Sequence, residues 1–151
     1  MKKIFYLAVM ALLSIGFIAC EKEDEKGNET PKTEETNNDP KMGKLTVTSE
    51  ENFSDTAYCS YVINGDKIDI SLLEVKFSNR MPMAVSPVLE GIPCAKDENG
   101  DISFEIATLV PTLNGAPFNK FIATDVKGSI KNGKISFSLN FGQYPTEFIE
   151  Y

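Results

Sequence analysis

The sequence contains neither histidine nor tryptophan, and it has only three cysteines among its 151 residues. Without imidazole, catalytic triads built on histidine are excluded, and the commonest side-chain metal ligand is missing. Three cysteines are too few for a small domain held by several disulfides. Positive charge is also scarce, with 15 Lys and Arg against 22 Asp and Glu and a net charge of −7. Nucleic acid is therefore not an expected partner.

After the first 20 residues the sequence has no long apolar run. The one notable run lies at the start of the chain. It covers residues 4–18, follows Lys2 and Lys3, and ends at Ala19-Cys20. A run of about 15 residues is shorter than the ~20 that a helix needs to span a bilayer. A basic start, an apolar middle and a small residue before the cleavage site are typical of a secretory signal peptide. An uncleaved anchor, or a plain cleaved signal with Cys20 incidental, are the alternatives.

The end of this segment carries a more specific motif. Phe17-Ile18-Ala19-Cys20 resembles the lipobox of bacterial lipoproteins, although Phe17 replaces the preferred Leu and Ile18 is bulkier than usual. The resemblance implies that residues 1–19 are a lipoprotein signal peptide and that Cys20 is lipidated and becomes the mature N-terminus. Several acyl chains, at about 0.8 kcal/mol per buried CH₂, would anchor the protein to a membrane permanently.

The stretch that follows, residues 20–42, is polar and mildly acidic, with hardly any apolar side chain. Such a composition cannot bury a core, so we expect a disordered tether. Within it, Lys22-Glu23-Asp24 resembles the Lys-acidic-acidic export signal of surface lipoproteins in the Bacteroidota. The resemblance implies an outer-membrane lipoprotein on the cell surface; an anchor facing the periplasm is the alternative.

From Gly43 to Tyr151 the pattern changes to two-residue alternation with closely spaced turn signals, which predicts an all-β domain. Asn64-Gly65 and Asn132-Gly133 are dipeptides favoured in tight hairpin turns. The first turn predicts the pairs Tyr61–Ile68, Cys59–Ile70 and Ala57–Leu72, and the second predicts Ile130–Ile135, Gly128–Phe137 and Val126–Leu139. A change of apolar parity near Leu72-Leu73 indicates a bulge. A strand is expected over 84–92, ended by Pro93, and Ile102, Phe104 and Ile106 form an inward row.

About eight consecutive antiparallel strands favour an up-and-down barrel, because closure leaves no exposed edge. A sandwich of two sheets is the alternative. The segments Ile68–Cys94 and Val126–Leu139 resemble the calycin-like β-barrel domain of Bacteroidota lipoproteins. That resemblance implies a lipocalin-shaped barrel over residues 43–151 and supplies no catalytic residues. Because Trp is absent, the Gly-x-Trp of true lipocalins is not present.

No residue pattern indicates an enzyme, a metal site or a cofactor. Cys59 and Cys94 are separated by one predicted strand, which would hold their backbones about 9–10 Å apart, beyond the ~7 Å limit for a disulfide. A buried free thiol at Cys59 is therefore expected, with the disulfide as the alternative. Asp97–Asp101 offers oxygen ligands at alternate positions, but Gly100 comes too early for an EF-hand, so a solvated hairpin loop is expected.

Two functions remain open. In the first, the barrel binds a small apolar ligand, as eight-stranded barrels can. In the second, the barrel is filled by its own side chains, has no ligand cavity, and acts as a non-enzymatic interaction module for a protein or glycan. The loops expected to make contacts are 78–83, 97–101 and 111–118, with Met81, Met83, Leu113 and Phe118 as the apolar contacts. Each of these four side chains could equally fold back over the barrel end.

Overall fold

The computed structural model describes residues 34–49 and 52–151, with side chains from residue 38 onward. The predicted signal peptide, Cys20 and the export motif Lys22–Asp24 lie outside these residues. Ten strands are formed within the described ranges: β1 (Glu34–Val47), β2 (Phe53–Asn64), β3 (Lys67–Leu73), β4 (Pro87–Lys96), β5 (Ile102–Leu109), β6 (Thr112–Leu113), β7 (Ala116–Pro117), β8 (Ala123–Lys131), β9 (Lys134–Phe141) and β10 (Tyr144–Glu150).

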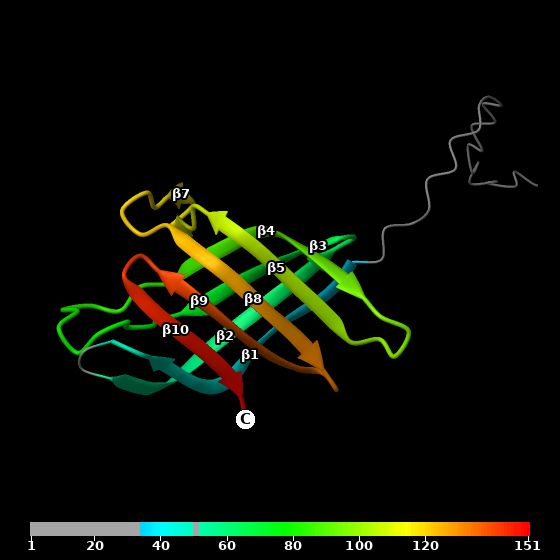
Figure 1. Ribbon diagram of the computed structural model, residues 1–151, viewed down its shortest axis with the longest axis horizontal. Coiled ribbons are helices and arrows are strands. Elements are labelled where there is room, and N and C mark those ends of the chain that lie inside the picture. Colours follow the sequence, from blue (N-terminus) through cyan, green and yellow to red (C-terminus); the bar gives the residue numbers. More distant parts are fainter. Residues whose placement is uncertain (1–33, 50–51) are drawn as a thin grey trace, which may run out of the picture. The chain divides into compact units, whose positions relative to one another are not determined.

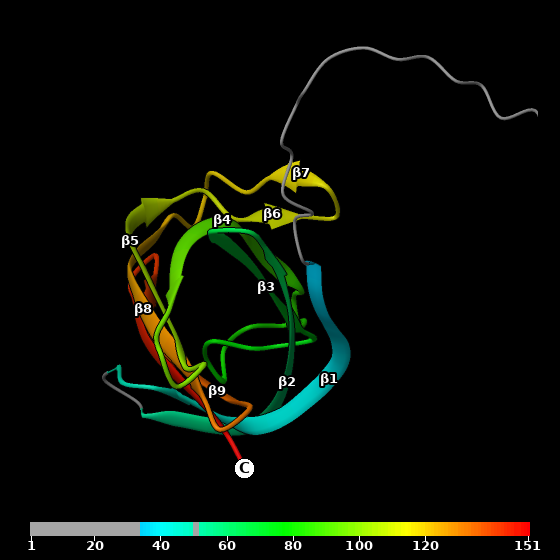
Figure 2. The ribbon, with the colours of Figure 1, turned by 90° about the vertical axis from the view of Figure 1, so that its right-hand side faces the viewer.

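Eight of these strands close into an antiparallel barrel (Figures 1 and 2). Each strand of the series β1-β2-β3-β4-β5-β8-β9-β10 pairs with the next, and β10 pairs back with β1. The remaining two, β6 and β7, form a short hairpin that is attached to β4. The predicted up-and-down barrel is confirmed, and the two-sheet sandwich is not formed.

The hairpin between β8 and β9 has the predicted turn. Asn132 and Gly133 both have positive φ, 51° and 76°, as a type I′ turn requires. Ile130 pairs with Ile135 and Gly128 with Phe137, as expected. The third predicted pair, Val126–Leu139, falls at a bulge. Thr124 pairs with Asn140 and Lys127 with Ser138, so that Asp125 and Val126 together oppose Leu139.

The hairpin between β2 and β3 differs from the prediction by two residues. Its turn is Gly65-Asp66, and the observed pairs are Ile63–Ile68, Tyr61–Ile70 and Cys59–Leu72. Gly65 has a φ of 65° at the first central position, which suits a type II′ turn. Because a shift of two preserves the face of every side chain, the same residues still point inward. Ile63, 7% exposed, lies in the same buried row and pairs with Ile68 in the observed register.

The first strand is longer than the sequence indicates. The apolar pattern placed the start of the domain at Gly43, yet β1 begins at Glu34, inside the expected tether. Residues 34–37 and 41–43 pair with β2, with an irregularity between Asn37 and Lys41. Backbone pairing along an existing strand needs no apolar side chains. This extension is therefore invisible to a search for hydrophobic alternation.

The β3–β4 region contains one confirmed feature and one corrected feature. Leu72 is buried, Glu74 has a positive φ of 49°, and Val75 and Phe77 are buried next, so the predicted change of parity is present. Pro93 does not end a strand, because β4 continues to Lys96. The Cys94 N–H donates to the Asp66 carbonyl of the loop before β3 (2.8 Å). The neighbouring Pro93 nitrogen therefore faces away from β3, where it interrupts no pairing.

Candidate functional site

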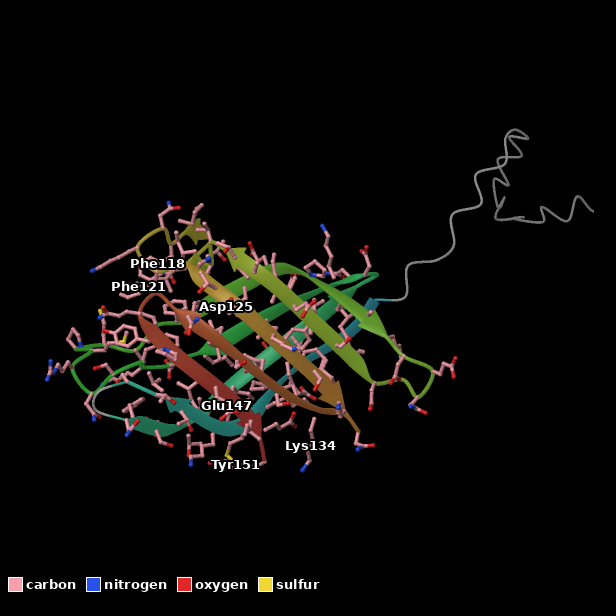
Figure 3. All side chains as sticks on the ribbon, viewed as in Figure 1. Phe118, Phe121, Asp125, Lys134, Glu147 and Tyr151 are labelled. Carbon is pink, nitrogen blue, oxygen red and sulfur yellow. The ribbon has the colours of Figure 1, made fainter. Side chains whose placement is uncertain are left out.

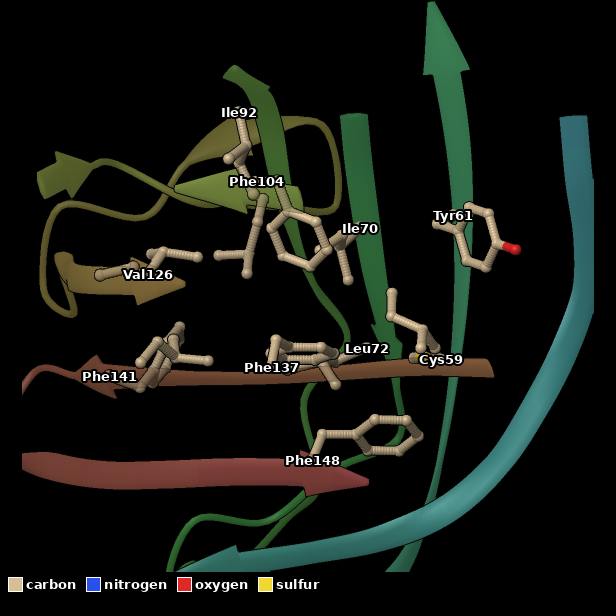
Figure 4. Packing of buried hydrophobic residues seen from close by; sticks show 14 of the residues in the cluster. Cys59, Tyr61, Ile70, Leu72, Ile92, Phe104, Val126, Phe137, Phe141 and Phe148 are labelled. Carbon is tan, nitrogen blue, oxygen red and sulfur yellow. The ribbon is translucent and has the colours of Figure 1, made fainter. Parts of the chain in front are cut away.

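The interior of the barrel is occupied by large side chains (Figure 4). Phe148 is 0% exposed, Phe104 2% and Phe137 3%. A chamber able to hold a ligand would leave accessible surface on the side chains that line it, because water-sized space would touch them. The central inward side chains have almost no such surface. Their packing is that of a filled core.

Gly128 on β8 contributes to this filling. A Cβ atom at this position would lie 2.5 Å from both Phe104 Cζ and Phe137 Cβ, so the two aromatic side chains pack directly against the glycine backbone. The sequence pattern predicted the Phe137 contact, and the structure adds Phe104 from the other neighbouring strand. Glycine is required here for close approach, not for an unusual φ.

The two ends of the barrel differ in the length of their connections. We name the end with the longer connections the loop end; its described connecting residues are 48–49, 52, 74–86, 110–122 and 142–143. The other end, the turn end, has the connections 65–66, 97–101 and 132–133 together with the start of β1 and the end of β10. Figure 3 shows Phe118 and Phe121 toward the first of these ends and Lys134 and Tyr151 toward the second.

An aromatic cluster closes the loop end from inside. The Phe77 and Phe141 rings stack with centroids 4.3 Å apart. Phe121 also stacks on Phe141, at a centroid distance of 5.5 Å. Phe118 lies 5.3 Å from Phe121, and Tyr144 lies 6.2 Å from it. Offset ring stacking of this kind adds about 0.5–1.5 kcal/mol per pair to simple burial. The connection 110–122 is therefore held firmly over the barrel.

The four predicted contact residues behave differently from one another. The Met83 side chain is 70% exposed, so it can still contact a partner. Met81 and Phe118 are half-buried and fold back against the core, and Met81 Sδ accepts a hydrogen bond from the Phe77 N–H (3.1 Å). Leu113 is half-buried and is paired with Pro87 in the β6–β4 ladder. The loop 97–101, predicted to act with the other two, lies at the opposite end because alternate hairpins face opposite ways.

A polar hollow of about 470 Å³ lies at the loop end. Its lining comes from three connections and the start of β10: Thr48, Ser49, Ser78, Arg80, Gln143, Tyr144 and Pro145. Sequence reasoning missed this group because its members are isolated polar residues without a motif. Their hydroxyl, amide and guanidinium groups offer hydrogen bonds to a polar surface, and only Arg80 among them is charged.

The cysteines of the barrel are both free thiols. Cys59 on β2 is buried, and Cys94 on β4 is half-buried, with β3 between them as predicted. Burial, with a smaller contribution from the Glu150 charge, raises the pKa of Cys59 from 9.0 to about 12. Burial also raises the pKa of Cys94. Neither thiol has the depressed pKa of a nucleophile.

The loop 97–101 uses its carboxylate to stabilise its own backbone. Asp97 Oδ1 accepts hydrogen bonds from the N–H groups of Asn99 and Asp101, both at 2.9 Å. This is an Asx turn of the kind that hairpin loops commonly contain. Within residues 34–49 and 52–151, no group of three or more His, Cys, Asp or Glu side chains is placed to hold a metal ion. Nor does any described helix have the length and apolarity to cross a membrane.

Comparison with protein-family models, with curated proteins and with solved structures gives no match to this chain.

Proposed function

We propose that this protein is a lipid-anchored, non-enzymatic interaction module that presents the loop end of a filled β-barrel to a protein or glycan at the cell surface. The observation that carries the proposal is the packing of the interior. Phe104, Phe137 and Phe148 occupy the middle of the barrel with at most 3% of their surface exposed. A small apolar ligand would have to displace them, and each such displacement costs packing energy of several kcal/mol.

The position at which the N-terminal segment joins the barrel supports the same proposal. The lipobox cysteine, Cys20, and the Lys22–Asp24 motif both precede β1 in the sequence. Since β1 begins at the turn end, the chain that carries these motifs joins the barrel there. The loop end is the opposite end and carries the exposed Met83, the polar hollow and the longest connections. It is therefore the end that offers the most varied surface to a partner.

Anchoring is tested with the full-length chain expressed in a bacterium that makes lipoproteins. Wild-type protein is expected to incorporate labelled fatty acid and to sediment with membranes, and Cys20→Ala is expected to do neither. Cys59→Ala is the matched control, because it removes a buried thiol and should leave labelling unchanged. Membrane association of Cys20→Ala at the wild-type level would overturn the lipid-anchor part of the proposal.

The recognition surface is tested by cross-linking on intact cells. A photoreactive amino acid replaces Met83 at the loop end in one variant and Lys134 at the turn end in a second. Both positions are exposed, so neither replacement disturbs the core. Cross-linked adducts are expected at position 83 and not at 134. Adducts at 134 alone would contradict the assignment, and a bound apolar molecule in native mass spectra of the full-length protein would favour ligand carriage instead.

A further inference from the structure

Exposed apolar side chains gather on the outer wall formed by β10, β1 and β2. In the described part of the chain seven large apolar side chains are exposed, and three of them belong to the loop end. The other four, with 44% to 58% of their surface exposed, lie together on this wall. We name these four side chains the wall patch: Met42, Tyr58, Ile149 and Tyr151.

The strand ladders place the members of the wall patch next to one another. Met42 pairs with Tyr58 across β1 and β2, and the Tyr58 hydroxyl donates to Met42 Sδ (3.6 Å). The Tyr151 N–H donates to the Met42 carbonyl (3.2 Å). Ile149 pairs with Lys44, the next outward residue of β1. Because side chains opposite each other in a ladder lie about 5 Å apart, the four form one continuous apolar surface.

The border of the wall patch has no dominant charge. Lys44 is exposed on β1, and the β9–β10 ladder brings the exposed Lys134 next to Tyr151. The exposed Glu147 lies two residues from Ile149 on the same face of β10. Figure 3 shows Tyr151, Lys134 and Glu147 on one side of the barrel. Tyrosine and lysine side chains suit a lipid surface, since each has an apolar body and a polar tip. The mixed border fits a zwitterionic surface better than a strongly charged one.

The wall patch is too small to hold two folded proteins together by itself. Half-exposed side chains of this size offer about 100 Å² each, or about 400 Å² for the patch. A stable protein–protein interface buries about 800 Å² on each partner. A second copy of this chain would also bring a net charge of −7 against the same net charge. The patch is therefore suited to a surface that is held nearby by another link.

The N-terminal segment provides that link to a membrane. In the proposed function Cys20 carries the lipid, and residues 21–33 separate it from Glu34, the first residue of β1. A segment of this length spans at most about 45 Å, at ~3.3 Å per residue. Glu34 and Met42 lie on the same strand, at most about 27 Å apart. The wall patch can therefore reach the bilayer that holds Cys20. A short link of this kind gives an effective concentration on the order of millimolar, at which weak contacts form.

We propose that the wall patch docks the barrel, by its side, on the lipid bilayer that carries its anchor. The four apolar side chains enter the headgroup region, and Lys44 and Lys134 remain among the headgroups. This inference rests on the lipid-anchored part of the proposed function. It leaves the loop end in solvent, where a partner can reach it.

The experiment measures which wall touches lipid. The full-length gene is expressed, and the protein is purified from membranes and reconstituted into vesicles of phosphatidylcholine and phosphatidylethanolamine. A photoreactive amino acid replaces Thr56, which is exposed and pairs with Lys44 beside the wall patch. In a second variant it replaces Ser103, which is exposed on β5 across the barrel. Mass spectrometry should find at least fivefold more phospholipid adducts at position 56 than at position 103. Equal yields, or a preference for position 103, would overturn the proposal.

Two double variants test the apolar side chains themselves. Tyr58→Thr with Ile149→Thr should lower the adduct yield at position 56 at least threefold. Val110→Thr with Ile122→Thr is the matched control, because it removes apolar side chains that are 40% and 41% exposed at the loop end. An unchanged yield in the first variant, or an equal loss in both, would refute the proposal, as would protein–protein adducts at position 56 in place of lipid adducts. The comparison of positions 56 and 103 needs neither variant, so it decides the case in which a variant does not fold.

Fatty-acid labelling of the same preparations separates this proposal from the proposed function. Protein that is labelled but shows no preference for position 56 refutes docking and keeps the lipid anchor. Protein that is unlabelled, remains bound to membranes and shows the preference refutes the lipid anchor and keeps docking. Protein with neither property refutes both.

Discussion

Truncating Phe148 is the most direct test of whether the barrel is filled. This ring on β10 is 0% exposed and stacks on Phe137 of β9 with a centroid distance of 5.3 Å. It also pairs across the closing seam with Leu45 of β1. The substitution Phe148→Ala would leave a cavity between three strands that are tied together by their ladders, so the wall has little freedom to collapse into it.

The expected cost is large compared with the stability of a domain of this size. Phe→Ala changes in cores cost about 3–5 kcal/mol. Small domains have a total free energy of unfolding of about 5–15 kcal/mol, so the variant would be near the threshold of folding. Phe148→Leu, which keeps most of the volume, should cost about 1–2 kcal/mol. Pairing Phe148→Leu with Phe137→Leu in a double-mutant cycle should show coupling of about 0.5–1.5 kcal/mol from the stacked rings.

Urea unfolding followed by tyrosine fluorescence gives the free energies. Tyr151→Ala is the control, because this ring is 58% exposed and its removal should change stability by no more than about 0.5 kcal/mol. A loss below about 1 kcal/mol for Phe148→Ala, with the denaturant slope unchanged, would refute the filled barrel. That result would mean that the ring borders open space, as the lining of a ligand chamber does.

Three further outcomes are expected. Gly128→Ala should lower the free energy of unfolding by about 1–3 kcal/mol in the same assay, because the new methyl overlaps Phe104 and Phe137, whereas Ser129→Ala should be nearly neutral. The Cys59 thiol should resist alkylation in native protein at pH 8 and react on unfolding, so rapid native labelling of Cys59 would contradict its burial. Since folding raises the Cys59 pKa from 9.0 to about 12, only the unfolded chain releases this proton just above pH 9. Stability should therefore fall as the pH rises from 9 toward 12, and the stability difference between parent and Cys59→Ala should show this slope and be flat below pH 9.

The fold class and most inward residues follow from local rules. Alternation of apolar residues indicates strands, and Asn132-Gly133 adopts the left-handed backbone that a two-residue hairpin requires. The separation of Cys59 from Cys94 by one strand was also predictable, because it depends only on the order of neighbouring strands. The change of parity after Leu72 is visible in the sequence because the spacing of the apolar residues shifts by one there.

Features that depend on backbone pairing between strands were harder to predict from the sequence. The turn at Gly65-Asp66 and the predicted turn one residue earlier place the same side chains inward, so hydrophobicity does not distinguish them. The early start of β1 at Glu34 depends on an available edge of β2, not on apolar residues. The position of Pro93 inside β4 is acceptable because its nitrogen faces the unpaired side.

By itself the sequence determined that the described domain consists of antiparallel strands around an apolar interior, since a period of two and tight turns leave few alternatives. The choice between a closed barrel and two packed sheets was made by the tertiary structure, through the pairing of β10 with β1. Only the tertiary structure decided whether that interior is full, which connections share an end, and where the β4–β5 ladder is interrupted. Filling depends on how Phe104 and Phe137 meet over Gly128 from neighbouring strands. The irregularity between β4 and β5 depends on where the β4–β5 ladder stops and where β6 begins to pair with β4. Both are relations between residues distant in the chain, and no local pattern encodes them.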